Sequence, residues 1–197
     1  MSDYSKSFIK DMVDYGVIKF GKFVLKSGRS SPYFFNLGSI NRGPGLERLG
    51  KAYAKRIQEL AVDFDLIFGP AYKGIPIAIT AAVSLANLNL NVGVTFNRKE
   101  AKAHGEQGRL IGEEMKDQRV LIADDVITAG TAIYEATNII TQAGGKLVGV
   151  VVALDRQEFG EDGVTALDKL TNTLKVPTVS IATLSDVIAY LDEEDPD

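Results

Sequence analysis

The sequence predicts an α/β fold in which helices flank a central parallel sheet. Short apolar segments rich in β-branched residues alternate along the chain with longer segments of helical periodicity. The apolar segments are continuous, as in strands that are buried on both faces of a parallel sheet. Several of them end in short segments rich in Gly, Pro or acidic residues that lead into a helix, which is the order of repeated strand–helix–strand units.

The composition is that of one globular domain. The 197 residues are 45% hydrophobic and 24% charged, and the net charge of -4 gives no general attraction to nucleic acid. The lack of Cys excludes disulfides, a thiolate nucleophile and a Cys-built metal site. No apolar segment has membrane-spanning length, and Met1–Lys6 lacks the basic-then-apolar order of a signal peptide. We therefore expect a cytoplasmic protein with no nucleic-acid or membrane partner.

The first 40 or so residues are expected to form a helix followed by extended chain. Apolar residues between Phe8 and Val13 recur at the spacing of one helix face. From Val17 to Leu37 the pattern is extended, with β-branched and aromatic residues interrupted at Gly28–Pro32. This N-terminal part therefore differs from the strand–helix repeats that follow it.

Residues 41–192 are expected to form the α/β core, followed by a frayed acidic tail at residues 193–197. Gly43-Pro44 is a typical helix start and Gly144-Gly145 a typical helix stop. The segment Asn97–Asp117 is long, polar and rich in Gly, and shows neither the helical nor the strand periodicity of apolar residues. Strands are predicted near residues 66–68, 92–96, 120–123, 147–154 and 178–182, and helices near 43–60, 75–86, 132–143, 164–174 and 184–191.

The segment Val120–Ala132 carries the clearest chemical signal. Its apolar strand ends in two adjacent carboxylates, Asp124 and Asp125, and a Thr- and Gly-rich loop then leads into a helix at about Ala132. Backbone N–H groups and hydroxyls at a helix N-terminus suit a phosphate. The two acids can accept hydrogen bonds from sugar hydroxyls or lie near a metal ion. The segment therefore predicts a site for a phosphorylated sugar.

Three other polar segments follow predicted strands. They are Gly69–Gly74, Asn97–Lys99 and Asp155-Arg156. Ligands of parallel α/β sheets bind beyond the carboxyl ends of the strands, so these segments and the two acids should meet at one edge of the sheet. The agreement of four segments is stronger evidence for a site there than any single one.

Each of these features also has a simpler interpretation. Asp124-Asp125 could be helix-capping carboxylates, although a cap needs only one acid. Lys73 could be a solvated turn residue, and Arg98–Arg109 a solvated charged loop. A loop of that length is usually functional or disordered, and its excess of basic residues, its glycines and His104, the only His of the chain, suit a lid over a diphosphate. Phe34-Phe35 could be strand core, and Arg156 could pair with Asp155.

The combination resembles the orotate phosphoribosyltransferase family of type I phosphoribosyltransferases over about residues 4–191. The diphosphate-sugar segment alone matches only the superfamily, whereas the N-terminal segment and the basic loop match this family. The resemblance implies a small N-terminal hood over the α/β core and an unusual peptide at Ala71-Tyr72. The matching segments are Lys26-Ser27-Gly28-Arg29-Ser30-Ser31-Pro32-Tyr33-Phe34-Phe35-Asn36, Gly69-Pro70-Ala71-Tyr72-Lys73-Gly74-Ile75-Pro76, Arg98-Lys99-Glu100-Ala101-Lys102-Ala103-His104-Gly105 and Val120–Ala132.

The resemblance implies where 5-phosphoribosyl 1-pyrophosphate binds. Asp124 and Asp125 would contact the ribose hydroxyls, residues 128–132 would hold the 5-phosphate, and basic residues would surround the pyrophosphate. The expected ligands of this substrate are Lys26, Tyr72, Lys73, Arg98, Lys99, Lys102, His104, Asp124, Asp125, Val126, Ile127, Thr128, Ala129, Gly130, Thr131 and Ala132. The expected catalytic residues are Lys102, as the main group, with Arg98, Lys99, His104, Asp124 and Asp125.

The other substrate implied is orotate, with Phe34, Phe35, Thr128 and Arg156 as its expected ligands. The reaction would give orotidine 5-phosphate and pyrophosphate in pyrimidine biosynthesis. Mg²⁺ would be held mainly by substrate oxygens, with no direct protein ligand and with both acids nearby. The resemblance also implies a homodimer in which loop 98–109 reaches the neighbouring active site.

Two other functions stay open at this point. A purine phosphoribosyltransferase would share Val120–Ala132 but gives no reason for the Lys26 and Phe34-Phe35 segment. A non-catalytic regulator that senses the diphosphate sugar and binds nucleic acid would need a basic surface, and the net charge of -4 argues against one.

Overall fold

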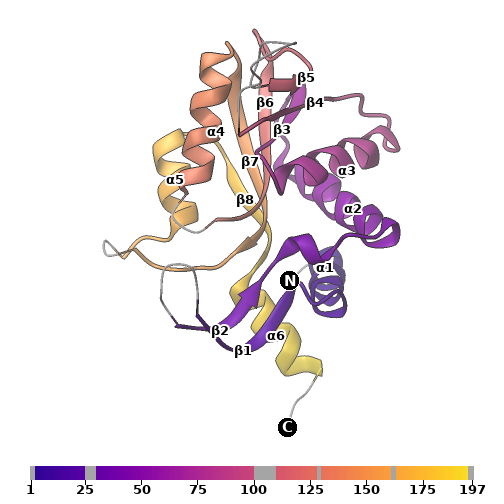
Figure 1. Ribbon diagram of the computed structural model, residues 1–197, viewed down its shortest axis with the longest axis vertical. Coiled ribbons are helices and arrows are strands. Elements are labelled where there is room, and N and C mark those ends of the chain that lie inside the picture. Colours follow the sequence, from indigo (N-terminus) through magenta and orange to yellow (C-terminus); the bar gives the residue numbers. More distant parts are fainter. Residues whose placement is uncertain (1–2, 25–29, 100–109, 128–129, 161–162, 195–197) are drawn as a thin grey trace.

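The computed structural model describes residues 3–24, 30–99, 110–127, 130–160 and 163–194. Helices and strands alternate through most of this part of the chain (Figure 1). In chain order the elements are α1 (Asp3–Asp14), β1 (Ile18–Val24), β2 (Ser30–Phe35), the 3₁₀ turn η1 (Leu37–Ser39), α2 (Gly43–Leu60), β3 (Leu66–Gly69), α3 (Gly74–Ala86), β4 (Gly93–Asn97), β5 (Leu110–Gly112), β6 (Arg119–Ile127), α4 (Thr131–Gln142), β7 (Lys146–Asp155), α5 (Ala166–Leu174), β8 (Thr178–Thr183) and α6 (Leu184–Glu194).

The central sheet has six strands in the order β5-β4-β3-β6-β7-β8. All neighbouring strands are parallel except β4 and β5, which are antiparallel. The predicted α/β class with a central, mostly parallel sheet is confirmed. From β3 the chain adds β4 on one side, and from β6 it adds β7 and β8 on the other side. The direction in which strands are added therefore reverses between β3 and β6. Ligands of such sheets bind at this point, beyond the carboxyl ends of the strands.

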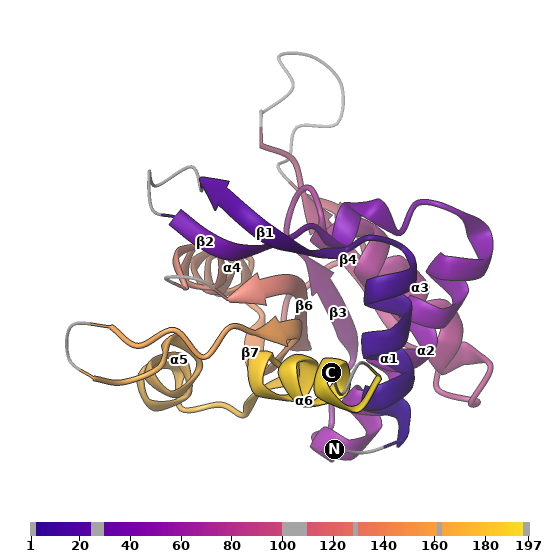
Figure 2. The ribbon, with the colours of Figure 1, turned by 90° about the horizontal axis from the view of Figure 1, so that it is seen from below.

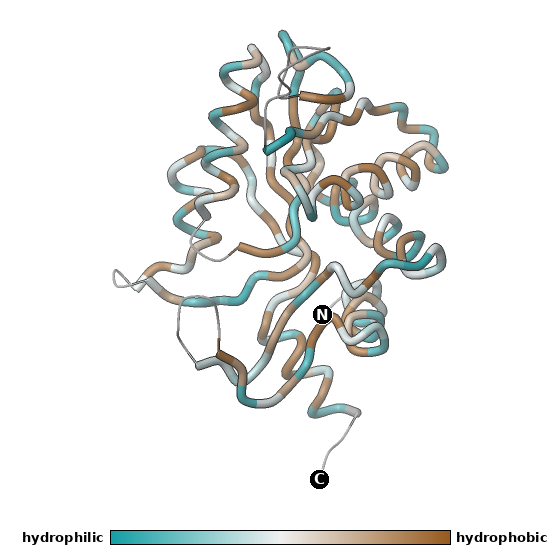
Figure 3. Tube along the Cα trace, viewed as in Figure 1, coloured by the Kyte–Doolittle hydropathy of each residue, from teal (hydrophilic) through white to brown (hydrophobic). Residues whose placement is uncertain are grey.

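Helices cover both faces of the sheet. Residues of α2 and α3, such as Tyr53 and Ile77, pack on one face with Leu121, while α4 and α5 pack on the other face with Ile122. Figure 1 shows these two layers on either side of the strands, and the hydropathy colouring of Figure 3 follows the apolar residues into the central strands. Continuous apolar sequences such as Leu66-Ile67-Phe68 arise because both of their faces are buried.

The N-terminal segment forms a separate antiparallel ribbon of β1 and β2, beside α1 (Figure 2). Phe8, Ile9 and Met12 bury the apolar face predicted for α1. The ribbon leads through Asn36, whose side chain accepts a hydrogen bond from the N–H of Gly38, into the core. It therefore lies where the resemblance implies a hood.

Three boundaries differ from the prediction. The strand β6 continues through both acids to Ile127, because its backbone pairs with β7 over this length. The strand β5 lies inside the segment Asn97–Asp117, for which the sequence predicts no strand, and it pairs there with β4. Pro32 lies within β2, at an exposed position of a two-stranded ribbon. Proline has no N–H to donate, and an edge position of this kind needs none. Among the described residues, no helix is both long and apolar enough to cross a membrane.

Candidate active site

The turn after β3 meets the end of β6 at the point where the sheet changes direction. Lys73, in the turn before α3, places its Nζ 2.7 Å from Oδ2 of Asp125. The lysine side chain is 48% exposed and the aspartate side chain 11% exposed, so one partner faces solvent and the other is enclosed. The structure thus brings together two of the predicted site residues, which lie far apart in the sequence.

The two acids are held by the strand itself. Asp124 accepts a hydrogen bond from the N–H of Asp125 at 2.9 Å, and Asp125 accepts one from the N–H of Val126 at 2.8 Å. The backbone carbonyl of Asp124 accepts a hydrogen bond from the buried hydroxyl of Tyr53 at 2.7 Å. Neighbouring strand residues point to opposite faces, so only Asp125 points toward the Lys73 turn.

Burial changes the electrostatics of Asp124. Desolvation, and then the negative charge of Asp125, raise the pKa of Asp124 to about 7. The N–H of Asp125 and the charge of Lys73 act in the opposite direction. A carboxyl group with a pKa near neutrality, beside a charged carboxylate–lysine pair, is typical of a functional site.

The turn between β3 and α3 has an unusual backbone. The Ala71-Tyr72 peptide bond is cis, in agreement with the unusual peptide that the resemblance implies. The N–H of Ala71 donates to Oδ1 of Asn97 at the end of β4, at 2.8 Å. The Tyr72 side chain is exposed, and Nζ of Lys99 lies 5.1 Å from the centre of its ring. Basic and polar side chains of two neighbouring strand ends therefore meet here.

The N-terminus of α4 borders the same edge. Gly130 precedes the helix with a left-handed φ of 79°, and an added Cβ would lie 3.2 Å from Leu170. The first N–H groups of a helix have no partner within the helix, which leaves those of Thr131 and Ala132 available to an anion. Val126 and Ile127 belong to β6 and pack into the core, so only their backbone is left to contact a substrate.

Ala132 also lines a cavity of about 600 Å³ with Arg98, Lys99 and residues of the turn after β3. The cavity thus joins the turn, the end of β4 and α4. Five of the predicted site residues, Lys26, Lys102, His104, Thr128 and Ala129, lie outside the described residues.

Arg156 follows β7 and is held on two sides. Its Nε donates to the hydroxyl of Tyr33 at 2.8 Å, and its Nη2 lies 2.6 Å from Oε1 of Glu158. Arg156 thus pairs with Glu158 and not with Asp155, whose carboxylate accepts the N–H of Gln157 at 2.9 Å. The turn thus joins the N-terminal ribbon to the core through Arg156.

Phe34 and Phe35 lie on opposite faces of the ribbon, as neighbouring strand residues must. Phe34 is 41% exposed and its ring centre lies 5.7 Å from that of Phe23, whereas Phe35 packs against the core. The two rings therefore do not form one continuous flat surface. Their contacts with orotate stay a prediction.

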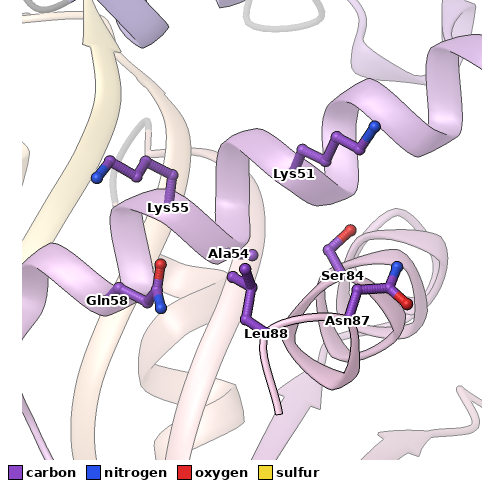
Figure 4. Close-up of a pocket in the computed structure, with 7 residues that line it drawn as sticks. All are labelled: Lys51, Ala54, Lys55, Gln58, Ser84, Asn87 and Leu88. Carbon is purple, nitrogen blue, oxygen red and sulfur yellow. The ribbon is translucent and has the colours of Figure 1, made fainter. Parts of the chain in front are cut away.

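A different hollow lies between α2 and α3 (Figure 4). Its volume is about 420 Å³, and it has an apolar floor that includes Ala54 and Leu88. Lys51 and Lys55 extend along its α2 rim, away from each other (Figure 4). No residue of the carboxyl edge lines it, so it is separate from the site around Asp125.

The residues present give no complete metal site of their own. Within the described ranges, no three His, Cys, Asp or Glu side chains gather into a cluster that would hold a metal ion. The oxygens of Asp124 and Asp125 are the hard ligands that Mg²⁺ prefers, but this ion usually keeps most of its coordination for water and substrate oxygens. The acids therefore fit an ion that arrives with a phosphorylated substrate.

Comparisons with known proteins agree with this geometry. Residues 36–184 match the model of the phosphoribosyl transferase domain family. An orotate phosphoribosyltransferase of Pseudoalteromonas translucida is 50% identical over 195 residues, which cover 98% of this chain and 91% of the relative. The chain belongs to the orotate phosphoribosyltransferase family. The orotate phosphoribosyltransferase of Shigella flexneri serotype 5b is likewise 50% identical over 98% of this chain and 91% of its own.

Solved structures of the orotate phosphoribosyltransferase family have the same fold. The crystal structure from Francisella tularensis superposes with a TM-score of 0.84 at 39% identity, over 97% of this chain and 92% of that one. The UMP synthase of Leishmania donovani superposes with a TM-score of 0.78 at 30% identity, where 96% of this chain matches 38% of the longer one. The predicted family and its transferase activity in pyrimidine biosynthesis are confirmed.

Sequence reasoning missed three residues that hold the site together. These are Tyr33, Tyr53 and Glu158. Tyr53 belongs to the apolar face of a predicted helix, and nothing in its spacing shows that its hydroxyl reaches β6. Asn97 belongs to a polar segment predicted to lie at this edge, and its contact with the N–H of Ala71 adds a role that its position alone did not give.

Proposed function

We propose that this member of the family transfers ribose 5-phosphate from 5-phosphoribosyl 1-pyrophosphate to orotate in a Mg²⁺-dependent reaction at the β3–β6 edge. The observation that carries the location is the 2.7 Å pair of Lys73 and Asp125, beside the N-terminus of α4. A lysine, two carboxylates and a helix N-terminus at one edge supply what a diphosphate, a polyol and a phosphate each require.

The ribose is proposed to lie against the two acids. Carboxylates accept hydrogen bonds from hydroxyls, and both acids lie at a strand end where the backbone fixes them. The 5-phosphate would then lie at the α4 N-terminus, where free N–H groups and the helix dipole favour a negative charge. Thr128 and Ala129 complete this loop in the sequence, outside the described residues.

The pyrophosphate is proposed to lie toward Lys73, Arg98 and Lys99. All three come from turns after β3 and β4, at the same edge of the sheet. Their positive charge would stabilise the charge that develops on the leaving pyrophosphate as the C1–O bond breaks. Lys102 and His104 are proposed to add to this charge from the basic loop, with Lys102 as the main catalytic group.

Mg²⁺ would neutralise part of the pyrophosphate charge when it is bound with the substrate. Asp124 and Asp125 are proposed to act on the substrate mainly through its hydroxyls or through water. The chain itself orients the ribose. No covalent intermediate is required, since transfer needs only the placement of the orotate nitrogen next to C1.

Orotate is proposed to lie between the ribbon and the core, with Arg156 binding its carboxylate or ring carbonyl. A guanidinium is suited to planar oxygen acceptors. Phe34 and Phe35 would contribute backbone contacts, and Thr128 a further polar contact.

A cytoplasmic homodimer is the proposed assembly. Ile79 and Val83 are four residues apart on α3, so they share a face, and they are 43% and 59% exposed. Leu88 and Leu90, just after the helix, are also exposed. Exposed apolar residues gathered in this way are typical of an interface. A second copy of this chain is the proposed partner, with loop 98–109 reaching the neighbouring active site.

A direct assay tests the proposed substrates. Orotate absorbance should fall when the protein, 5-phosphoribosyl 1-pyrophosphate and Mg²⁺ are mixed, and should not fall when the metal is chelated. Adenine, guanine, hypoxanthine and uracil are tested in parallel. Consumption of a purine with orotate inert would overturn the assignment in favour of a purine enzyme.

A further inference from the structure

We propose that Tyr33 and Glu158 are positioning residues that fix the guanidinium plane of Arg156 and thereby set the preference for a pyrimidine that bears a carboxylate. The inference rests on the proposed binding of orotate by Arg156. It adds two residues that do not themselves need to touch the base.

The guanidinium is held at two of its three nitrogens. Nε donates to the Tyr33 hydroxyl at 2.8 Å, and Nη2 lies 2.6 Å from Oε1 of Glu158. Its central carbon also lies 5.0 Å from the centre of the Tyr33 ring. Two hydrogen bonds on different nitrogens fix both the direction and the plane of this group. Among the described residues no hydrogen bond engages Nη1, so its two N–H groups remain for a ligand.

Tyr33 and the turn that carries Arg156 and Glu158 are themselves anchored. Tyr33 is only 6% exposed, and its carbonyl accepts the hydroxyl of Ser31 at 2.6 Å. In the turn that carries Arg156, the side chain of Gln157 accepts the N–H and hydroxyl of Ser185 at the start of α6, at 2.8 and 2.6 Å. The guanidinium is thus held between the ribbon and a turn that is bound to α6, and its side chain is 11% exposed.

A fixed, enclosed guanidinium discriminates between bases by geometry. A carboxylate placed in its plane completes the hydrogen bonds of the free N–H groups. A base without that carboxylate leaves them unpaired in an enclosed site, which is the kind of mismatch that enzymes reject most strongly. A guanidinium free to rotate would lose part of this difference, because it could turn toward solvent.

The first test is Tyr33→Phe, which removes the acceptor of Nε and keeps the ring. We expect the KM for orotate to rise about five- to tenfold, which is the loss expected for one ordinary intramolecular hydrogen bond. The KM for 5-phosphoribosyl 1-pyrophosphate should stay within about twofold, and the ratio of kcat/KM for orotate over uracil should fall. Tyr15→Phe is the matched control, since Tyr15 accepts a hydrogen bond from Arg48 and lies 5.2 Å below its guanidinium, away from this site.

The second test compares Glu158→Ala with Glu158→Gln. The alanine should raise the KM for orotate in the same selective way, and the glutamine should restore it because its carbonyl oxygen can still accept from Nη2. Equal rises in both KM values, or no rise for orotate in Tyr33→Phe and Glu158→Ala, would overturn the inference.

Arg156→Ala separates this inference from the proposed function. If it raises the KM for orotate while the Tyr33 and Glu158 variants do not, only the positioning role fails. If Arg156→Ala leaves the KM for orotate unchanged, the proposed orotate contact fails and the inference fails with it.

Discussion

Replacing Asp124 by Asn should stabilise the fold above neutral pH. The pKa of this acid is about 7 in the folded protein and 3.8 in its reference state, chiefly because of desolvation and then because of the charge of Asp125. Well below pH 3.8 both states are protonated, and at pH 4 the folded state is still protonated whereas the unfolded chain has begun to ionise. As the pH rises toward 7 the unfolded chain ionises first, so the free energy of unfolding falls until both states are ionised.

The size of the effect follows from the shift. One pKa unit corresponds to about 1.4 kcal/mol, so the shift from 3.8 to about 7 costs the fold about 4 kcal/mol above pH 7. Asn has no such penalty, and its carbonyl oxygen can still accept the N–H of Asp125. We expect Asp124→Asn to exceed the parent by about 2–4 kcal/mol in free energy of unfolding at pH 8, and to differ little from it at pH 4.

Urea unfolding at pH 4, 6 and 8, with linear extrapolation, measures this difference. Asp65→Asn is the control of opposite sign, since hydrogen bonds from Arg119 lower the pKa of Asp65 to about 2. Its stabilisation is present above the unfolded pKa and is lost as the pH falls through the folded pKa, so its removal should destabilise the protein at pH 8. An Asp124→Asn variant that is less stable than the parent at pH 8, or whose advantage is the same at all three pH values, would refute the reasoning.

Three further predictions concern the substrate site and its supports. Lys102→Ala should lower turnover by orders of magnitude while circular dichroism shows an intact fold; near-normal turnover would remove Lys102 from the mechanism. Mixed dimers of Lys102→Ala and Asp125→Asn chains should regain activity if the loop acts across the interface, and inactivity of confirmed mixed dimers would argue for sites completed within one chain. Tyr53→Phe should lower the free energy of unfolding by about 1–3 kcal/mol in urea titration, because the Asp124 carbonyl loses a buried donor; an unchanged value would show that the bond is replaced.

Local sequence patterns predicted most of the core. Continuous apolar segments such as Leu147–Leu154 identified strands buried on both faces, and Gly43-Pro44 identified the start of α2. The strand β5 escaped the prediction because three residues have no measurable period, and only pairing with β4 makes them a strand. The end of β6 escaped it because charged residues interrupt an apolar pattern although the backbone pairing continues.

The chemistry of single residues was easier to predict than their supports. Lys73 and Asp125 could be placed at one sheet edge because the rule about strand ends needs only the order of elements. The partners of Arg156 could not, since Tyr33 lies in a ribbon whose position against the core depends on packing that has no sequence signal. The same limit applies to Phe34 and Phe35, whose adjacency in the sequence separates them in space.

The two adjacent acids acquire different properties because they lie on a strand rather than in a loop. Strand alternation turns Asp125 toward Lys73, with which it forms an ion pair 2.7 Å long, whereas Asp124 is buried on the other face and its pKa is raised mainly by desolvation. A loop would let the carboxylate of Asp124 turn to solvent and lose the desolvation that raises its pKa. A substrate hydroxyl that donates to Asp124 stabilises its charged form, so binding of the ribose and ionisation of Asp124 should favour each other. The extension of β6 through both acids is therefore what couples the site to pH near neutrality.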